Sequence, residues 1–429
     1  MTIVCGMHMG FPHGGAATSR VAAYARGLRA AGIPSQIILL QPSEIPSLGV
    51  FNHKVRGEYE GIAFEYSCGR TVWGRSFRER RWLDLKGLVR GTMMVARLRP
   101  IGDQGAVLLY GENPLIAFAL RLASRRAGLP LLAEVSELPF VRARRRPIVG
   151  RLARGYEPFA FRVFDGAIVV TERLERHVAP LLPRGAGIVR VPVLVDLDAF
   201  AGDARGGAEE REVLAGGSQA RSDDASLGAV RRVVYCGMLN EEKDGVATLM
   251  RAFAALPAEL SDVRLELVGD SYQASRIPEF RAIGADLGIE ARVDFVGTVP
   301  RDALRPYLAQ ATVLALARPS SLQAAAGFPT KLAEYLASGR PVVVTRTSEI
   351  DRFLSDGESA YLVPPDDWRA FAAALRIPLE HPAEAEAVGR EGRRVAEQVF
   401  DYRLGGRVLA EFVRSLAPRA RRVGKEAGA

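Results

Sequence analysis

Short apolar runs alternate with longer amphipathic stretches along most of the chain. The first apolar run, Thr2–Cys5, leads through a loop with several glycines into a stretch of helical periodicity, Ala16–Ala31. Apolar runs of this length are typical of strands buried on both faces, and strands that alternate with helices predict a parallel sheet. Further strands of this first set are expected at Ile37–Leu40, Val107–Leu109, Leu131–Glu134, Ala167–Val170 and Ile188–Val191.

A second set of alternating elements begins at Arg232. Between the two sets lie residues 201–229, which contain six glycines and little apolar periodicity. This composition is typical of a linker or an insertion without a core of its own. The expected strands of the second set are Val233–Cys236, Arg264–Val268, Val293–Val296, Val313–Ala317, Val342–Val344 and Ala360–Val363.

The pattern predicts an α/β fold with two Rossmann-like, doubly wound domains that face each other across a cleft. The N-terminal domain is expected over residues 1–200 and the C-terminal domain over residues 230–399. A helix at 400–417, apolar on one face, is expected to pack back on the N-terminal domain, and residues 418–429 are expected to form a basic, disordered tail. Open α/β sheets bind ligands beside the carboxyl ends of their strands, so the cleft is the predicted ligand site.

Positive charge is concentrated in a few segments. The 429 residues carry a net charge of +9, and Arg70–Arg99 contains eight Arg and one Lys against two acids. Arg142–Arg154 contains six Arg and no acid. Such clusters attract anionic surfaces, so a peripheral contact with an anionic membrane is predicted at these two segments. Arg142–Arg154 has no interleaved aromatic residue, which disfavours nucleic acid as the partner.

The sequence shows no pattern of export or of membrane insertion. It opens on an apolar strand pattern without a charged leader, and it has no run of about 18 apolar residues. Its three cysteines have no metal-ligand spacing and suit buried thiols in a reducing compartment. A cytoplasmic protein is therefore expected, with peripheral attachment to the inner face of the membrane.

Residues 327–344 carry the strongest chemical signal. A loop at Gly327 opens a helix at about Thr330, and this helix carries Lys331 and Glu334. A helix N-terminus with a nearby lysine is a site for an anion. Glu334 lies one turn further along, within reach of hydroxyl groups on the same ligand. The pattern predicts a site for a nucleotide diphosphate and its ribose.

Two further loops follow predicted strands. Gly14 and Gly15 precede the first long helix, where glycine lets a backbone approach a phosphate or a sugar. Their spacing is not GxGxxG, so a nicotinamide site is disfavoured. Lys243 follows the first strand of the second set and can project its charge into the cleft. Asp196 and Asp198 form a DxD motif without other acids or histidines beside them, so neither a metal nor another cofactor is expected.

Several segments, taken in order, resemble those of one enzyme family. GGAATSRVAAYARGLRAAGI resembles the opening loop and helix of the family 4 glycosyltransferases, and FDGAIVVTERLERHV with VPVLVDLDAF resembles the end of their first domain. CGMLNEEKDGVATLMRAF resembles their phosphate-binding segment, and GFPTKLAEYLASGRPVVVT with LVPPDD resembles their donor-binding block. The chain therefore resembles this family over almost its full length, and the resemblance implies the two-domain GT-B fold.

The resemblance also implies a role for each candidate residue. Lys243 would contact the donor diphosphate and act in catalysis, while Thr330 and Lys331 would offer backbone amides to the same phosphates. Glu334, the second Glu of the family's E-x7-E pattern, would hold the ribose. Glu137, in the segment AEVSELPF, would contact the acceptor or the donor sugar as a second catalytic residue. The implied donor-binding set is Gly14, Gly15, Lys243, Arg318, Gly327, Phe328, Thr330, Lys331 and Glu334.

Two positions depart from the family pattern. The first Glu of E-x7-E falls at Ala326, and the family's common Arg in the phosphate-binding segment is Met238, a charge that Arg318 would replace. The expected function is retaining, metal-independent transfer of a sugar from a nucleotide-diphosphate sugar to a lipid-linked acceptor or a polysaccharide precursor. Because of Ala326 and Met238, a nucleotide-sugar binding protein without catalysis stays open. A nucleotide-sugar epimerase on the same scaffold also stays open.

Overall fold

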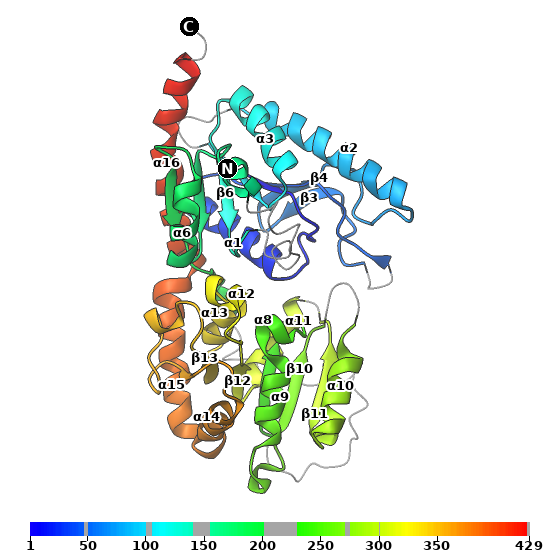
Figure 1. Cartoon of the computed structure of the whole chain (residues 1–429), viewed down its shortest axis with the longest axis vertical. Coiled ribbons are helices and arrows are strands. Elements are labelled where there is room, and N and C mark those ends of the chain that lie inside the picture. Colours follow the sequence, from blue (N-terminus) through cyan, green and yellow to red (C-terminus); the bar gives the residue numbers. More distant parts are fainter. Residues whose placement is uncertain are drawn as a thin grey trace. The chain divides into compact units, whose positions relative to one another are not determined.

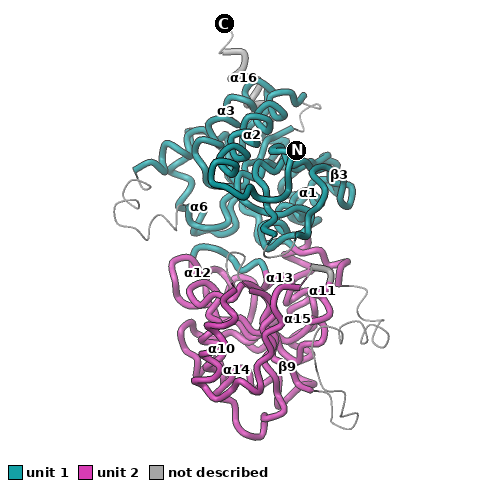
Figure 2. Tube along the Cα trace, turned by 90° about the vertical axis from the view of Figure 1, so that its right-hand side faces the viewer, with its two compact units in different colours: residues 1–194, 326–330, 402–429 teal, residues 195–325, 331–401 magenta. Residues whose placement is uncertain are grey.

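The structure of the protein is a computed structural model that describes residues 1–46, 50–99, 105–139, 155–200, 230–270, 275–299 and 301–426. The chain divides into two compact units (Figure 2). Unit 1 comprises Met1–Leu194, Ala326–Thr330 and Tyr402–Ala429, and unit 2 comprises Val195–Ala325 and Lys331–Asp401.

The described strands of unit 1 form one eight-stranded sheet. They are β1 (Thr2–Cys5), β2 (Gln36–Leu39), β3 (Arg56–Tyr59), β4 (Ile62–Tyr66), β5 (Val107–Tyr110), β6 (Leu131–Val135), β7 (Gly166–Val169) and β8 (Gly187–Arg190). Their order is β3-β4-β2-β1-β5-β6-β7-β8, and all neighbours are parallel except β3 and β4, an antiparallel pair at one edge. The central strands are buried along their length, which explains their nearly continuous apolar sequences.

Helices cover both faces of this sheet (Figure 1). Successive residues of a strand point to opposite faces, so Ile3 belongs to the core under α1 (Ala16–Ala30) and α16 (Tyr402–Glu426), and Val4 belongs to the core under α3 (Pro114–Ala127). The long helix α2 (Phe77–Ala96) packs against α3. Further short helical elements of unit 1 include α6 (Glu172–Val178) and η2 (Ala179–Leu181).

The described strands of unit 2 form a six-stranded, parallel sheet. They are β9 (Arg232–Cys236), β10 (Arg264–Val268), β11 (Val293–Gly297), β12 (Val313–Leu316), β13 (Val342–Thr345) and β14 (Tyr361–Val363). Their order is β11-β10-β9-β12-β13-β14. The strand order reverses between β9 and β12. Doubly wound sheets bind ligands beside the carboxyl ends of the strands at such a switch point.

Helical elements precede, connect and follow these strands between residues 195 and 401. On one face, α9 packs against both α10 and α14. The elements are η3 (Asp198–Phe200), α8 (Glu241–Asp244), α9 (Val246–Ala254), η5 (Ala258–Leu260), α10 (Ile277–Asp286), η6 (Glu290–Arg292), α11 (Arg301–Gln310), α12 (Leu322–Ala326), α13 (Thr330–Ala337), η7 (Ile350–Arg352), α14 (Trp368–Glu380), α15 (Pro382–Val395) and η8 (Ala396–Phe400).

The predicted fold class is confirmed, because each unit is built on a parallel sheet with the strand order of a doubly wound domain. The prediction that regular structure ends after residue 417 is wrong, since α16 continues through Glu426. The residues beyond Pro418 are mostly Arg, Ala, Lys and Glu, which favour helix, and extending an existing helix requires no new nucleus. The predicted linker at 201–229 and the basic segment Arg142–Arg154 lie outside the described residues.

None of the described helices is long and apolar enough to span a membrane.

Candidate functional site

The loop after β9 carries Lys243 on the short helix α8. Asn240 caps this helix, because its Oδ1 accepts a hydrogen bond from Lys243 N at 3.0 Å. Gly245 ends the helix with a left-handed backbone (φ 68°), and a Cβ there would lie 1.8 Å from the carbonyl oxygen of Ala317. Only glycine fits such a position. The backbone around Lys243 is therefore held against the segment that leaves β12.

The side chain of Lys331 lies in a buried ion pair. Its Nζ is 2.8 Å from Asp244 Oδ2 and 2.9 Å from the hydroxyl of Tyr235, and it stands 4.6 Å from the centroid of the Tyr235 ring. The Lys331 and Asp244 side chains are only 17% and 6% exposed. The sequence predicted a lysine available to an anion here, whereas the structure shows its ammonium group bonded to a carboxylate that the prediction did not include.

Arg318 lies next to this pair at the end of β12. It is 1% exposed, and its Nε donates a hydrogen bond to the carbonyl oxygen of Lys243 at 3.3 Å. Burial by itself raises the pKa of Asp244. The charge and hydrogen bond of Lys331, with the charges of Arg318 and Lys243, outweigh burial and lower that pKa. The structure thus brings three predicted donor-binding residues together around one ionised acid, in the interior of unit 2.

Helix α13 is fastened to β9 through Tyr335. The Tyr335 hydroxyl accepts a hydrogen bond from Cys236 N at 2.6 Å and donates one to Cys236 O at 3.2 Å. Glu334 is half-buried on the same helix. Burial, and after it the charge of Glu334, raises the pKa of the Cys236 thiol. Glu334, the residue before Tyr335, therefore belongs to the helix that is tied to the carboxyl end of β9, the strand end that also leads to Lys243.

Three more predicted donor residues, Gly327, Phe328 and Thr330, fall in the segment Ala326–Thr330, which groups with unit 1. Gly327 and Phe328 are buried, and Thr330 is half-buried. Ala326, at the position of the family's first Glu, has no exposed surface. A carboxylate at such a position would lose its hydration, so alanine suits the surroundings of this position.

In unit 1 the loop after β1 holds Gly14 and Gly15. A Cβ at Gly14 would lie 2.2 Å from Thr18 Oγ1, which donates a hydrogen bond to Gly10 O at 2.7 Å. Gly15 is the N-cap residue of α1 and gives the first helical amides no side-chain partner. The side chain of Asn52, which lies outside this loop in the sequence, holds the loop by accepting a hydrogen bond from His13 N and donating one to His13 O.

A second buried ion pair, absent from the sequence prediction, lies at the end of β6. Arg20 Nε is 2.5 Å from Glu134 Oε1, with side chains 2% and 3% exposed, and Arg20 also donates to Val191 O at 3.3 Å. Burial raises the pKa of Glu134, and the charge and hydrogen bond of Arg20 oppose this rise without reversing it. Glu137, a predicted catalytic residue, is half-buried and adds to the rise.

The sequence contains weak signals for the three ion-pair residues that the prediction did not include. Glu134 is the acid that interrupts an otherwise apolar strand, and Arg20 lies among small residues in the first turns of a helix. Asp244 directly follows the predicted Lys243. An acid in a buried strand or beside a predicted cation needs a partner, yet only the fold identifies that partner.

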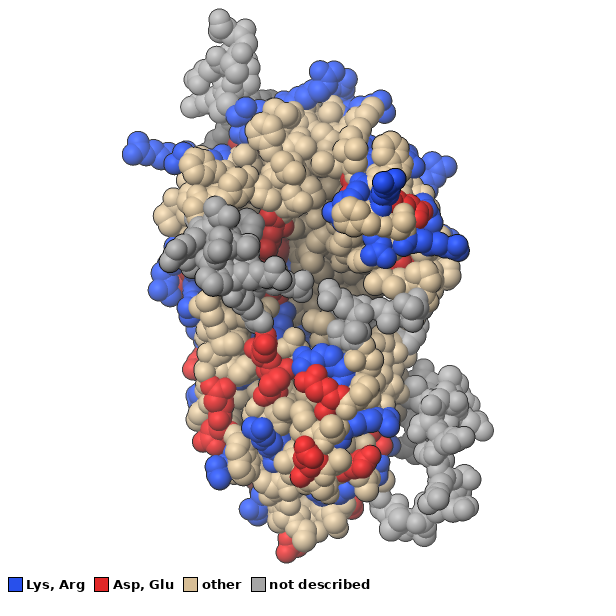
Figure 3. All heavy atoms as spheres, turned by 45° about the vertical axis from the view of Figure 1, so that its right-hand side comes forward, with Lys and Arg blue, Asp and Glu red and all other residues tan. Residues whose placement is uncertain are grey.

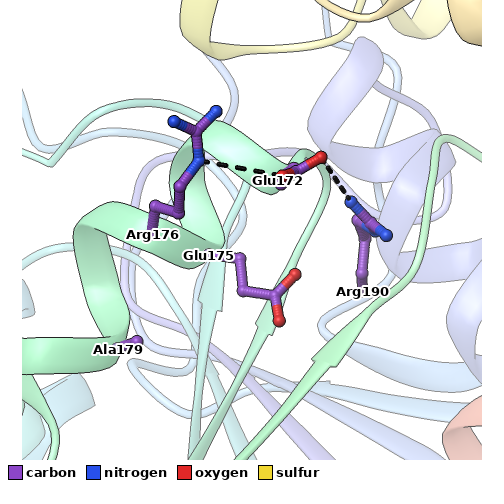
Figure 4. Close-up of a pocket in the computed structure, with 5 residues that line it drawn as sticks. All are labelled: Glu172, Glu175, Arg176, Ala179 and Arg190. Carbon is purple, nitrogen blue, oxygen red and sulfur yellow. Dashed lines mark ion pairs between the residues drawn. The ribbon is translucent and has the colours of Figure 1, made fainter.

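A pocket of about 450 Å³ opens on α6 and β8 of unit 1 (Figure 4). Glu172 lies between Arg176 and Arg190 there, at 3.9 Å and 3.6 Å, and Ala179 and Glu175 complete the lining. No predicted site residue lines this pocket. Its ion pairs join solvent-exposed side chains, and ion pairs of this kind contribute little free energy. In the predicted DxD motif, Asp196 Oδ1 accepts a hydrogen bond from Asp198 N at 3.2 Å.

Comparison with known proteins identifies relatives of both units. Residues 230–381 match the family described as glycosyl transferases group 1. The chain is 27% identical over 350 residues to an MMP α-(1→4)-mannosyltransferase of Mycolicibacterium hassiacum, covering 81% of this chain and 78% of the relative. It is 28% identical over 252 residues to a GDP-mannose-dependent α-(1-6)-phosphatidylinositol monomannoside mannosyltransferase of Mycolicibacterium smegmatis, covering 58% of this chain and 62% of the relative.

Among solved structures, the sucrose-phosphate synthase of Thermosynechococcus elongatus is similar in fold. Its TM-score is 0.73 at 18% sequence identity, and the match covers 97% of this chain and 99% of the synthase. At this identity the likeness concerns the fold alone.

Proposed function

Because the chain is a group 1 glycosyltransferase of the GT-B fold, we propose that it moves a hexose from a nucleotide-diphosphate sugar to a lipid-linked or polysaccharide-precursor acceptor. We further propose that it retains the anomeric configuration and requires no metal ion. The observation that carries this proposal is the gathering of Lys243, Arg318 and Lys331 around Asp244 in unit 2, beside the strand switch point.

Positive charge at this place suits the leaving group of the reaction. When the bond between the sugar and the diphosphate breaks, negative charge develops on the phosphate, and Lys243 and the N-terminus of α13 would stabilise it. In a retaining transfer the acceptor oxygen bonds the anomeric carbon on the face that the phosphate leaves. The departing phosphate oxygen can accept the acceptor's proton, so no separate strong base is required.

The other site residues receive roles within the same proposal. Glu334 binds the ribose hydroxyls, because Tyr335 ties its helix, α13, to the strand end that leads to Lys243. Glu137 contacts the acceptor or the donor sugar from unit 1. Both relatives compared above are described as mannosyltransferases, and one as GDP-mannose-dependent. A GDP-linked mannosyl donor is therefore the first donor to test.

A donor panel tests the proposal directly. GDP-, UDP-, ADP- and CDP-sugars are supplied with and without EDTA, and the release of nucleoside diphosphate and the anomeric configuration of the product are measured. Lys243→Ala should lower kcat about 10²- to 10³-fold, the usual effect of losing one donor to a developing oxyanion. Glu334→Ala should raise the donor KM. The exposed residues Arg251 and Glu259 of the same unit provide the matched controls Arg251→Ala and Glu259→Ala.

The panel also separates the alternatives. Donor conversion without any acceptor would identify an epimerase instead. Donor binding without turnover, across a broad set of acceptors, would identify a binding protein and implicate Ala326 and Met238. Loss of activity in EDTA, restored by a divalent cation, would contradict the metal-independent mechanism.

We also propose that α2 binds an anionic membrane, since this helix exposes a row of large apolar side chains, with exposed Arg78 and Arg81 among them, on the side away from the protein. Its buried positions are Leu83, Gly87, Gly91 and Val95. Two of these are glycines that contact Leu40, so the helix lies close against the strand end. The opposite side exposes large apolar residues, with Trp82 63% exposed, followed by Leu85, Val89 and Met93. Exposed apolar stripes of this kind mark an interaction surface.

The neighbouring surface has the same character. Helix α3 packs against α2 and exposes Leu115, Phe118 and Leu122. Basic side chains prevail over acidic ones on the surface of unit 1 that Figure 3 shows. An apolar helix face with basic flanks inserts at the headgroup level of an anionic bilayer, where each Lys or Arg contributes roughly 1 kcal/mol. A lipid-linked acceptor would be reached from this surface.

Vesicle flotation tests the membrane proposal. The protein should bind vesicles rich in phosphatidylglycerol and bind pure phosphatidylcholine at least tenfold less, with binding weakened by salt. Leu85→Asp with Val89→Asp should abolish flotation, while the control Val408→Asp, on the exposed side of α16, should not. Equal flotation of all these proteins would rule out α2 as the binding surface.

A further inference from the structure

The buried pair of Lys331 and Asp244 has a role beyond that of a phosphate contact. We propose that Asp244 and Tyr235 hold the Lys331 ammonium group as a positioning unit for the donor site, and that the charge of Asp244 limits how tightly the site binds a diphosphate. This inference rests on the proposed function, because it assumes that a nucleotide diphosphate binds at this place in unit 2.

The three residues come from three separate elements. Tyr235 is on β9, Asp244 ends α8, and Lys331 is in the first turn of α13. The Lys331 Nζ joins them, at 2.8 Å from Asp244 Oδ2 and 2.9 Å from the Tyr235 hydroxyl, and Tyr235 and Asp244 are also linked directly at 3.1 Å. Since α8 carries Lys243, the pair sets the position of that lysine relative to the start of α13.

The cluster of Lys331, Asp244 and Tyr235 also fixes the loop between β9 and α8. The Tyr235 hydroxyl donates a hydrogen bond to the carbonyl oxygen of Met238 at 2.5 Å. A Cβ at Gly237 would lie 2.3 Å from the Lys331 Nζ, so the ammonium group is packed directly against the backbone of this loop. Loss of Lys331 would therefore change the conformation of the loop in addition to removing a charge.

The effect of the pair's charge on binding can be measured separately from the effect of its geometry, because Asp244 and Lys331 have opposite charges. Asp244→Asn raises the local charge by one, Lys331→Met lowers it by one, and the double variant restores the total. The affinity for an anion should follow this charge. The rate of transfer should follow the geometry instead, and all three variants disturb the geometry. A purely structural pair would affect binding in the same direction in both single variants.

The experiment measures the Kd of GDP and UDP by calorimetry, and kcat with the donor that the panel identifies. Asp244→Asn should bind the nucleoside diphosphate about fivefold more tightly than the unmodified protein, and Lys331→Met about fivefold or more weakly, as expected for one charge near a phosphate. The double variant should bind within about twofold of the unmodified protein. In all three, kcat should fall at least about tenfold.

The surface pair Arg264 and Asp294 provides the matched control. It is a two-bonded ion pair in the same unit, with both nitrogen–oxygen distances 2.6 Å. Arg264→Met and Asp294→Asn make the same charge changes on β10 and β11, and both should leave Kd and kcat within about twofold. If Lys331→Met does not fold, Tyr235→Phe provides the alternative test of the pair's positioning role. It keeps every charge, so its Kd should stay near that of the unmodified protein while kcat falls.

Two results would overturn the inference, and they are distinguishable. If the unmodified protein transfers sugar but Asp244→Asn weakens GDP or UDP binding as Lys331→Met does, the proposed function stands and Asp244 does not limit affinity. If the unmodified protein binds no nucleoside diphosphate at all, the proposed function fails and the inference fails with it.

Discussion

Each unit contains a buried acid paired with a cation near the carboxyl end of a strand. The pKa of the acid in unit 1 is raised above its ordinary value, whereas the pKa of the acid in unit 2 is lowered. In unit 1 Glu134 meets Arg20, and burial, with the charge of Glu137, keeps the pKa of Glu134 raised. In unit 2 Asp244 meets Lys331, and the charges of Arg318 and Lys243 help to lower its pKa. The difference arises from what surrounds each pair, because both pairs are almost fully buried.

The contrast concerns the charge state that each pair favours. The raised pKa means that burial disfavours the Glu134 carboxylate more than Arg20 favours it. An ionised acid among three cations suits an anionic ligand, because it balances them until the ligand arrives. Substitutions in these two pairs therefore test the proposed division into an acceptor-binding unit and a donor-binding unit most directly.

The largest effect is expected from removing the two cations in turn. Arg20→Met should cost about 3–5 kcal/mol of unfolding free energy, because it leaves a buried acid without its principal opposing charge. Lys331→Met should cost only about 1–3 kcal/mol, since Arg318 and Lys243 still act on Asp244. Urea unfolding measures both values. A larger loss of unfolding free energy in Lys331→Met than in Arg20→Met would contradict the proposed difference between the two pairs.

Nucleotide binding sharpens the same comparison. GDP or UDP affinity, measured on the folded variants, should be unchanged by Arg20→Met and reduced by Lys331→Met, because the two cations belong to different units. Equal loss in both variants would mean that Arg20 also acts on the donor.

The pH dependence of stability should carry opposite signs in the two units. The folded pKa of Glu134 lies above its ordinary value of 4.5, so this acid's contribution is full below that value and is lost as pH rises through the folded pKa. The folded pKa of Asp244 lies below 3.8, so its contribution is full above that value and is lost as pH falls through the folded pKa.

Two amide variants test these signs. In thermal unfolding between pH 3 and pH 7, Glu134→Gln should flatten the decline on the neutral side. Asp244→Asn should flatten the decline on the acid side. Parallel pH profiles for the two variants would show that their surroundings do not differ in the way the structure indicates.

The smallest effects concern the hydroxyl groups of the two clusters. Tyr235→Phe should cost about 1–2 kcal/mol, since its hydroxyl bonds Met238, Asp244 and Lys331 at 2.5, 3.1 and 2.9 Å. Ser136→Ala should cost less than about 0.5 kcal/mol, because its bond to Glu134 is long, at 3.3 Å, and the residue is half-buried. Denaturant midpoints at constant slope measure both. A reversed order would place the better-connected hydroxyl in unit 1.

Much of the fold could be predicted because its signals are local. Buried parallel strands are short apolar runs, and Thr2–Cys5 and Arg264–Val268 have the predicted bounds in the structure. Helix ends are less local. The extension of α16 to Glu426 depends on a helix that already exists at Tyr402, so composition alone, rich in Arg and Gly near the end, suggested a disordered tail.

The candidate site shows the same boundary between local and tertiary information. Lys243 and Glu334 could be selected from the sequence, because each lies in a segment whose loop or helix N-terminus has a recognisable pattern. The position of Arg318 beside Lys243 could not be derived, because 75 residues separate them and only the pairing of β9 with β12 brings them together.

The sequence by itself determined the alternation of strands and helices, the two-domain class and the identity of most candidate residues, since these follow from local apolar patterns and short motifs. Only the tertiary structure decided which charges meet. Lys331 is paired with Asp244 across 87 residues, and Arg20 with Glu134 across 114 residues. A buried charge is defined by its partner and its hydration, and both depend on how the strands are ordered in the sheet.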